Sequence, residues 1–372
     1  MAKYLKQKTR PDFKIALLAV AMSLFGIIMI ASASDVIAYE KTKEGLNSYV
    51  ITQSIALVIG IILMVIFSSI DYRNYKKMAL TFMIITVVAL IAVFLPGIGY
   101  EAKGAHRWIN LGFTTLQPSE FAKITFIVYL CAWLDTKAYE INSFKKFFLP
   151  FIAMLSIVSL LIILQPDLGT LTTIVLSAIA VFFVSGAPAW QFASMAGFLL
   201  VAFSIFIRSK PYRWQRFLTY LDPSSEVLGS GYHVNQAFIA VSQGGLWGLG
   251  FGKSIQKMEY LPEPHTDSIF AIICEELGFM RSIFVIIAFV ALFVMGMGVA
   301  KTAPDKFGRL LAVGITASLC MQALINIAAM LGLVPLTGVT LPFISYGGNS
   351  LVVSLALIGI LLNISRVSKQ YV

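Results

Sequence analysis

The sequence predicts an all-α polytopic membrane protein with about ten transmembrane helices, and three observations favour this fold class. Of the 372 residues, 58% are hydrophobic and only 12% are charged, whereas a soluble domain carries roughly 25% charged residues. Apolar runs recur along the whole chain, many of them near the ~20 residues that a helix needs to cross a bilayer. Lysine and arginine gather in alternate connections between these runs, as the positive-inside tendency predicts.

Ten apolar runs define the expected helices, and we take residues 1–372 as a single membrane domain. The runs are 14–32, 49–69, 78–97, 117–134, 148–165, 168–186, 189–207, 278–300, 310–333 and 349–365. The first run has full membrane length, which favours a transmembrane helix over a cleaved signal peptide. An inside N-terminus puts most basic residues in short inside segments. Both termini are then cytoplasmic, with tails 1–13 and 366–372.

The charge and cysteine content exclude several other classes of protein. The formal net charge of +10 predicts no nucleic-acid partner, because the inside loops of membrane proteins are rich in lysine and arginine. Cys131, Cys274 and Cys320 lie in apolar runs without paired spacing, which disfavours a disulfide framework or a metal cluster. No P-loop, dinucleotide fingerprint, zinc site or serine triad is present. Soluble-enzyme chemistry is therefore disfavoured.

One group of basic residues falls on the outer side in this topology. Its members are Lys103, Arg107, Lys123, Arg208, Lys210, Arg213, Arg216, Lys253, Lys257 and Arg281. Cations that accumulate against the positive-inside tendency indicate an anionic ligand, such as a phosphate or a lipid headgroup. For any single residue, snorkelling of a long side chain beside the membrane is an equally good explanation.

The longest connection, residues 208–277, predicts a large outer loop. Glycines alternate with bulky apolar residues over 244–252, which is typical of a segment that re-enters the membrane or lies along its surface. Val234, Phe238 and Val241 share a helical face and predict a short interfacial helix upstream.

Acidic residues near the ends of apolar runs are the candidates for chemistry or for internal pairing. Glu120 and Lys123 are three positions apart in one predicted helix and should form an ion pair. Asp167 precedes an apolar run, which favours a helix-capping role. Asp267 lies among cations and glycines and is the leading catalytic or binding candidate. Capping of the helix that follows is the alternative for Asp267.

Two further segments carry polar groups on the outer side. Glu275 and Glu276 lie in an apolar run, so at least one of them needs a partner such as Arg281. Residues 335–350 contain prolines and glycines together with Ser345, Asn349 and other hydrogen-bonding residues. They predict a structured outer loop that could close over a site.

These residues occur within motifs that resemble a known family. The motifs read GAHRWINLG, QPSEFAK, QPDLGT, RWQRFLTYLDP, GGLWGLGFG, QKMEYLPEPHTDSIFAIICEELG and PLTGVTLPFISYGGNS. In this order, and over nearly the whole chain, they resemble the shape, elongation, division and sporulation (SEDS) proteins. The QKMEYLPEPHTD form is closer to the FtsW-like division and sporulation branch than to the RodA-like elongation branch.

The resemblance implies a peptidoglycan glycosyltransferase that polymerises lipid II at the outer face of the bacterial cytoplasmic membrane. It implies lipid II and undecaprenyl-diphosphate-linked glycan as substrates, and a class B penicillin-binding protein and other divisome proteins as partners. By resemblance, Asp267 is the essential carboxylate. No cofactor is assigned, and a divalent cation, Mg or Mn, is the one candidate. A lipid II flippase, or a non-catalytic scaffold that activates the penicillin-binding protein, are the alternatives.

The expected site around Asp267 has a cationic set and a supporting set. The residues expected near the diphosphates are Lys103, Arg107, Lys123, Arg213, Arg216 and Lys257. The residues expected to support the site are Glu120, Asp167, Glu275, Glu276, Ser345 and Asn349.

The chain departs from the family pattern at two places. Ser268 follows the HTD triplet, where the family usually has phenylalanine, and we expect this smaller polar residue to loosen the setting of Asp267. Met280 and Arg281 replace a small pair that contains glycine. We expect Arg281 to pair with Glu276 or to perturb the packing.

Overall fold

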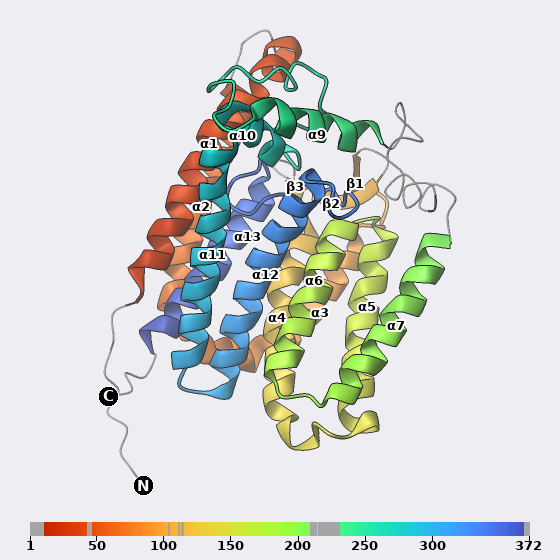
Figure 1. The fold of residues 1–372 in the computed structure, drawn as a ribbon. Helices are drawn as coiled ribbons and strands as arrows, with labels where there is room; N and C mark the ends of the chain where they lie inside the picture. Colours follow the sequence, from red (N-terminus) through yellow and green to blue (C-terminus); the bar gives the residue numbers. More distant parts are fainter. Residues whose placement is uncertain are drawn as a thin grey trace.

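A computed structural model describes residues 11–42, 47–102, 105–110, 112, 115–208, 214 and 231–367. The chain is largely helical, with one small sheet (Figure 1). The elements are α1 Phe13–Thr42, α2 Asn47–Ser69, α3 Tyr72–Ala92, β1 Gly99–Ala102, β2 Ala105–Asn110, β3 Thr115–Leu116, α4 Pro118–Thr136, η1 Ala138–Glu140, η2 Phe144–Phe148, α5 Leu149–Leu164, α6 Leu168–Val184, α7 Ala189–Arg208, α9 Tyr232–Gly244, α10 Ile269–Leu277, α11 Phe279–Thr302, α12 Lys306–Met330 and α13 Gly348–Arg366.

All ten predicted apolar runs fall on helices. Seven described helices are long and apolar enough to cross a membrane, namely α1, α2, α3, η2 with α5, α11, α12 and α13. Helices α6 and α7 are apolar, but their apolar segments are shorter than those of the seven. Helix α4 is not among the seven and carries the charged residues Glu120 and Lys123 in its first two turns. The chain is therefore a polytopic helical membrane protein by length and composition.

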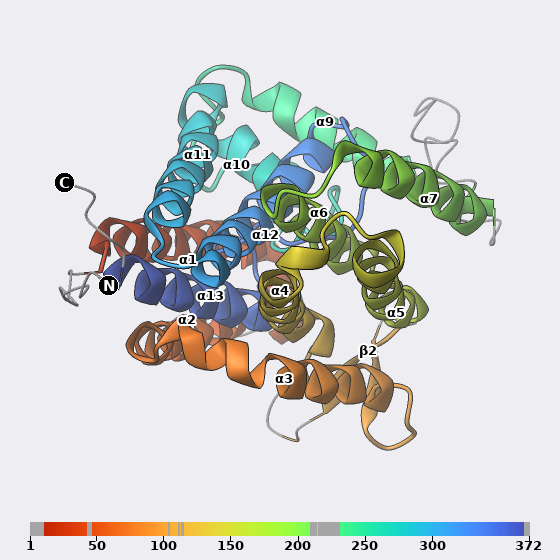
Figure 2. The same ribbon diagram turned by 90° about the horizontal axis from the view of Figure 1, so that it is seen from below.

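Helices α12 and α13 form the centre of the bundle. Within their candidate spans, 78% and 83% of residues are buried, against 28–44% in the other five. Seen from below, they lie between α1, α2 and α11 on one side and α5 and α6 on the other (Figure 2). The outer helices expose large apolar side chains such as Leu17 and Phe284, which suits contact with lipid.

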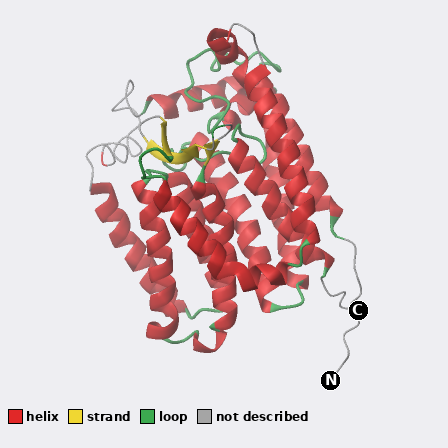
Figure 3. Cartoon of the chain, turned by 180° about the vertical axis from the view of Figure 1, so that it is seen from behind, coloured by secondary structure: helices red, strands yellow, loops and turns green. Residues whose placement is uncertain are grey.

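The two ends of the bundle differ. At the end we call the terminal end, the start of α1 meets the end of α13, where the Asp12 N–H donates to Ser365 Oγ at 3.1 Å. The opposite end, here the loop end, carries the sheet, α9, α10 and the connection 331–347 (Figures 1 and 3).

The expectation of an all-α chain is wrong in one detail. Residues 99–116 contain a three-stranded antiparallel sheet with the order β1-β2-β3. The predicted start of the third helix at 78 is also wrong. Helix α3 begins at Tyr72 because the Asp71 carboxylate caps it, accepting from the Arg73 N–H at 3.0 Å.

The helix predicted around Val234, Phe238 and Val241 is present as α9. Its buried residues are the small Ala237, Ala240 and Gly244, which allow close approach to α10. A Cβ on Gly244 would lie 2.0 Å from the Cys274 carbonyl oxygen. Phe238, on the predicted apolar face, is exposed, which suits a helix at a membrane interface.

Candidate active site

Asp267 ends a tight turn at the loop end and is partly exposed. The next residue, Ser268, is the N-cap of α10, so the alternative capping role for Asp267 is wrong. The turn includes Glu263 with a φ of +51°, a left-handed conformation that non-glycine residues rarely adopt. The Thr266 hydroxyl lies 3.1 Å from Asp267 Oδ1. The half-buried carboxylate therefore lies at the end of a strained turn.

Helix α12 fixes the backbone at Asp267 through Asn326. The Asn326 Nδ2 donates to the carbonyl oxygens of Asp267 and Val339, both at 2.7 Å. One turn earlier, Gln322 Nε2 donates to the Thr340 carbonyl oxygen at 2.9 Å. Sequence reasoning missed both amides. The sequence did contain a signal for them: Gln322 and Asn326 are four positions apart in an apolar helix, so they share a face. Polar groups buried in such a helix need hydrogen-bond partners.

The connection 331–347 lies against Asp267, as predicted for a structured loop. The Tyr346 N–H donates to the His265 carbonyl oxygen at 2.9 Å, and Ser345 Oγ accepts from the Leu341 N–H at 2.7 Å. A Cβ on Gly338 would lie 4.0 Å from Asp267 Oδ2. Asn349 extends the contacts to the sheet by donating to the Thr115 carbonyl oxygen at 2.9 Å.

Burial raises the pKa of Asp267 above its ordinary value. The charge of His233 and the hydrogen bond from Thr266 act in the opposite direction, and the charge of Glu263 raises the pKa further. A carboxylate with a raised pKa is a stronger base once it is ionised. The arrangement can therefore accept a proton from a hydroxyl group placed within hydrogen-bond reach.

The predicted ion pair between Glu120 and Lys123 is present. Lys123 Nζ lies 2.7 Å from Glu120 Oε2 and donates to Gln322 Oε1 at 2.7 Å. The Lys123 side chain is only 2% exposed, and an ammonium buried at this depth requires such partners. The Lys123 side chain therefore links α4 to α12. Its contact with a diphosphate stays a prediction.

Asp167 and Arg107 organise the turn between α5 and α6. Asp167 caps α6 by accepting from the Thr170 N–H at 3.2 Å, as predicted, and also accepts from the Ser119 hydroxyl at 2.7 Å. Arg107 Nε donates to the Gln165 carbonyl oxygen at 3.0 Å, and Nη2 donates to that of Pro166. A guanidinium has five N–H donors, so Arg107 keeps donors for a further acceptor.

Glu275 and Glu276 are fully buried at the end of α10. Glu275 Oε1 accepts from the Ile255 N–H at 2.8 Å, and its Oε2 accepts from the Ser254 hydroxyl at 2.5 Å. Glu276 pairs with Lys257 at 3.1 Å. Its two oxygens also accept from the Ser32 hydroxyl at 2.7 and 2.8 Å.

The expectation that Arg281 pairs with Glu276 is therefore wrong. Arg281 is exposed and donates to the Trp247 carbonyl oxygen at 3.3 Å. Lys257 is closer because residues 248–257 wrap the end of α10, with the Leu249 and Gly250 N–H groups donating to the carbonyl oxygens of Glu275 and Glu276. The Lys257 side chain is only 3% exposed, so its contact with a diphosphate also stays a prediction.

Three of the expected cationic residues, Lys103, Arg213 and Arg216, lie outside the described residues. Across the parts of the chain that the structure describes, no three His, Cys, Asp or Glu residues gather as a metal-binding group. The three cysteines are free, as predicted.

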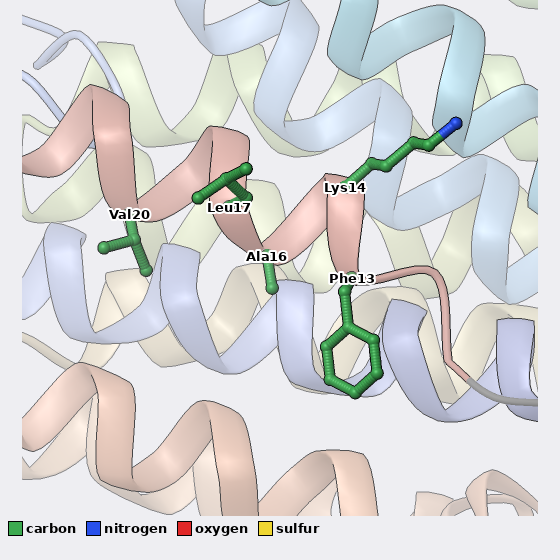
Figure 4. Close-up of a pocket in the computed structure, with 5 residues that line it drawn as sticks. All are labelled: Phe13, Lys14, Ala16, Leu17 and Val20. Atoms are coloured by element: carbon green, nitrogen blue, oxygen red, sulfur yellow. The ribbon is translucent and has the colours of Figure 1, made fainter.

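Two apolar hollows lie away from Asp267. One, of about 460 Å³, is lined by residues on the first turns of α1, including Phe13 and Leu17 (Figure 4). The other, of about 490 Å³, is lined by α7 residues that include Leu199 and Phe203. Both have almost wholly apolar walls on helices that expose other large apolar side chains. Contact with lipid explains them without a chemical role.

Comparison with known proteins gives the family. The family of FtsW, RodA and SpoVE, described as cell cycle proteins, matches residues 13–370. This chain belongs to that family. It is 39% identical to stage V sporulation protein E of Bacillus subtilis over 98% of this chain and 99% of the relative. It is 40% identical to the probable peptidoglycan glycosyltransferase FtsW of Geobacter sulfurreducens, over 97% of this chain and 96% of the relative.

Solved structures of FtsW/RodA/SpoVE family members share the fold. A chain from a structure described as the coordination of polymerization and crosslinking by a peptidoglycan synthase complex matches with a TM-score of 0.79. It is 26% identical over 96% of this chain and 98% of that chain. A variant of the rod shape determining protein RodA of Thermus thermophilus matches with a TM-score of 0.71 and 26% identity, over 97% and 99%.

Proposed function

We propose that this chain is a peptidoglycan glycosyltransferase that polymerises lipid II for synthesis of the division or sporulation septum. The observation that carries the proposal is the near full-length relation to proteins named as probable peptidoglycan glycosyltransferases. The Asp267 site supports it, because a carboxylate of raised pKa lies in a polar loop region at one end of a membrane bundle.

The proposed reaction transfers a glycan from a lipid diphosphate to the sugar 4-hydroxyl of lipid II. The hydroxyl oxygen forms a bond to the anomeric carbon of the donor, and the bond from that carbon to the diphosphate oxygen breaks. The diphosphate leaves with the electron pair, and Asp267 accepts the hydroxyl proton. A single displacement of this kind inverts the anomeric configuration.

The departing diphosphate requires positive charge nearby. Arg107 is the best-placed described candidate. Two of its five N–H donors bind carbonyl oxygens of described residues, and it lies on β2 at the loop end. We retain Lys103, Arg213 and Arg216 as proposed contacts. Lys123 and Lys257 would act from inside the fold, by fixing α4 and the 248–257 segment.

The proposed topology has ten crossings in one domain, with both termini in the cytoplasm of a bacterium. The tails are 1–13 and 366–372, and the loop 208–277 lies outside the cytoplasmic membrane. Two observations support it. Arg73 lies in the first turn of α3, which binds Asn363 near the end of α13, and it pairs with Asp305 before α12. Helix α10, which begins two residues after Asp267, lies at the loop end (Figure 1). A lipid-linked substrate can then reach Asp267 from the outer leaflet.

The proposed partner is a class B penicillin-binding protein, which crosslinks the new glycan, with other division proteins around the pair. The match to a chain from a peptidoglycan synthase complex that coordinates polymerization and crosslinking supports this proposal. The undecaprenyl-diphosphate-linked glycan is the proposed donor and lipid II the proposed acceptor.

The test is polymerisation of labelled lipid II by the purified chain with its penicillin-binding partner. Wild-type protein should make glycan strands, and Asp267→Asn should lower the rate about 10²–10⁴-fold, the usual contribution of a general base. Movement of lipid II across liposomes without polymer would support a flippase instead. Partner binding without either activity would support a scaffold.

A further inference from the structure

The hydroxyl of Ser268 links Asp267 to helix α9. Ser268 follows Asp267 directly and is fully buried. Its Oγ donates to the Pro262 carbonyl oxygen at 2.8 Å and lies 2.6 Å from Nε2 of His233, near the start of α9. Ser268 is thus fixed on both sides, so the expectation that it loosens the setting of Asp267 is not supported by its contacts.

Counting protons assigns the direction of the second hydrogen bond. A serine hydroxyl has one hydrogen, and a carbonyl oxygen can only accept. The Ser268 hydrogen is used by Pro262, so the contact with His233 requires a hydrogen on Nε2. His233 therefore donates to Ser268, either as the neutral Nε2–H imidazole or as the imidazolium.

The charged surroundings of Asp267 give His233 a second influence. Two described charges act on the pKa of Asp267: His233 lowers it and Glu263 raises it. Helix α12 carries its only charged residues, Lys306 and Arg309, at the terminal end, and the connection 331–347 contains no Asp, Glu, Lys, Arg or His. His265 of the same turn packs against Tyr49 and Tyr346.

We infer that His233 is a positioning residue for Asp267, acting through the buried hydroxyl of Ser268. The imidazole N–H holds Ser268 against α9, and the same bond holds the backbone that carries the carboxylate. When protonated, the imidazole also favours the ionised carboxylate. The inference rests on the proposed role of Asp267 as the base.

The first test is a double-variant cycle in the polymerisation assay. A net hydrogen bond changes an equilibrium by about 2–10-fold, so His233→Ala and Ser268→Ala should each lower the rate by about that factor. The double variant should lose no more than the worse single variant, because both remove one linkage. His233→Gln keeps a donor near the Nε2 position and should restore the rate to within ~2-fold. Ser242→Ala, on the exposed face of α9, is the matched control.

The second test is the pH profile, which a merely structural role would not move. Polymerisation should fall as the pH drops through the pKa of Asp267, because the base must be ionised. Loss of the imidazolium in His233→Gln removes a charge that favours the carboxylate. The acid limb of this variant should therefore move to higher pH.

Opposite results would overturn the inference. These are a wild-type rate in His233→Ala, multiplied losses in the double variant, or an acid limb in His233→Gln at the wild-type pH. Asp267→Asn, assayed in parallel, separates this failure from failure of the proposed function. If Asp267→Asn polymerises normally, the assignment of the base is wrong. If it is inactive while His233→Ala has wild-type activity, only the role of His233 is wrong.

Discussion

The two ends of helix α10 hold carboxylates in opposite ways. At its C-terminal end, Glu275 and Glu276 are fully buried and accept from backbone N–H groups, serine hydroxyls and the Lys257 ammonium. At its N-terminal end, Asp267 is partly exposed, and the Thr266 hydroxyl lies 3.1 Å from its Oδ1. No lysine or arginine among the described residues forms an ion pair with Asp267.

The difference supports the proposed division of roles between these carboxylates. Burial shields the carboxylates of Glu275 and Glu276 from a substrate, and their oxygens already accept hydrogen bonds from the protein. Asp267 is partly exposed, and burial of the rest of its side chain raises its pKa. We therefore assign structure to Glu275 and Glu276 and proton transfer to Asp267.

The largest expected effect comes from breaking the pair of Lys257 and Glu276. Lys257→Ala leaves Glu276 as a buried charge without its cation, which costs about 3–5 kcal/mol of unfolding free energy. Thermal unfolding in detergent measures the loss. The double variant Lys257→Met with Glu276→Gln should recover most of it. Lys253→Ala, which changes an exposed lysine in the same segment, should leave stability unchanged. Equal effects for Lys257→Ala and Lys253→Ala would contradict the assignment.

A smaller effect is expected at the glycines of the segment that wraps α10. Gly248 has a φ of +83°, and a Cβ there would lie 2.3 Å from the Glu276 carbonyl oxygen. Gly252 has a φ of +77° with no atom within 4 Å of a Cβ. Alanine at either site adds left-handed strain of about 1–2 kcal/mol. Only Gly248→Ala adds a clash, so it should unfold at the lower temperature. Identical melting temperatures would show that the close approach is unimportant.

The smallest effect is expected at Arg281. It is exposed and donates to one carbonyl oxygen at 3.3 Å, and such surface contacts rarely contribute more than about 0.5 kcal/mol. Arg281→Ala should keep both its melting temperature and its polymerisation rate. A large loss of stability would mean that Arg281 has replaced Lys257 as the partner of Glu276.

Much of the fold could be predicted because lipid imposes a simple pattern. Each of the ten apolar runs is a helix, since a chain in hydrocarbon must satisfy its backbone hydrogen bonds internally. The sheet at 99–116 was missed because its strands are short: β1 has four residues and β2 has six. They also lie in a connection between apolar runs, where the sequence shows no long apolar pattern. The start of α3 was missed because its first turn is polar and is set by the Asp71 cap.

The site could be predicted only where pairing is local in sequence. The bond between Glu120 and Lys123 follows from helical spacing, and the Asp167 cap follows from its place before an apolar run. The partner of Glu276 depends on how a glycine-rich segment folds back over α10, which no spacing rule gives. Asn326 reaches Asp267 across 59 positions of sequence, so tertiary structure alone brings them together.

The most direct test of this comparison measures polymerisation and thermal unfolding in parallel for Asp267→Asn and Glu276→Gln. We predict that Asp267→Asn keeps the wild-type melting temperature and loses polymerisation. Glu276→Gln should melt at a lower temperature, while its folded fraction still polymerises lipid II. A normally active Asp267→Asn, or a Glu276→Gln protein that is stable and inactive, would contradict the division of roles between the two ends of α10.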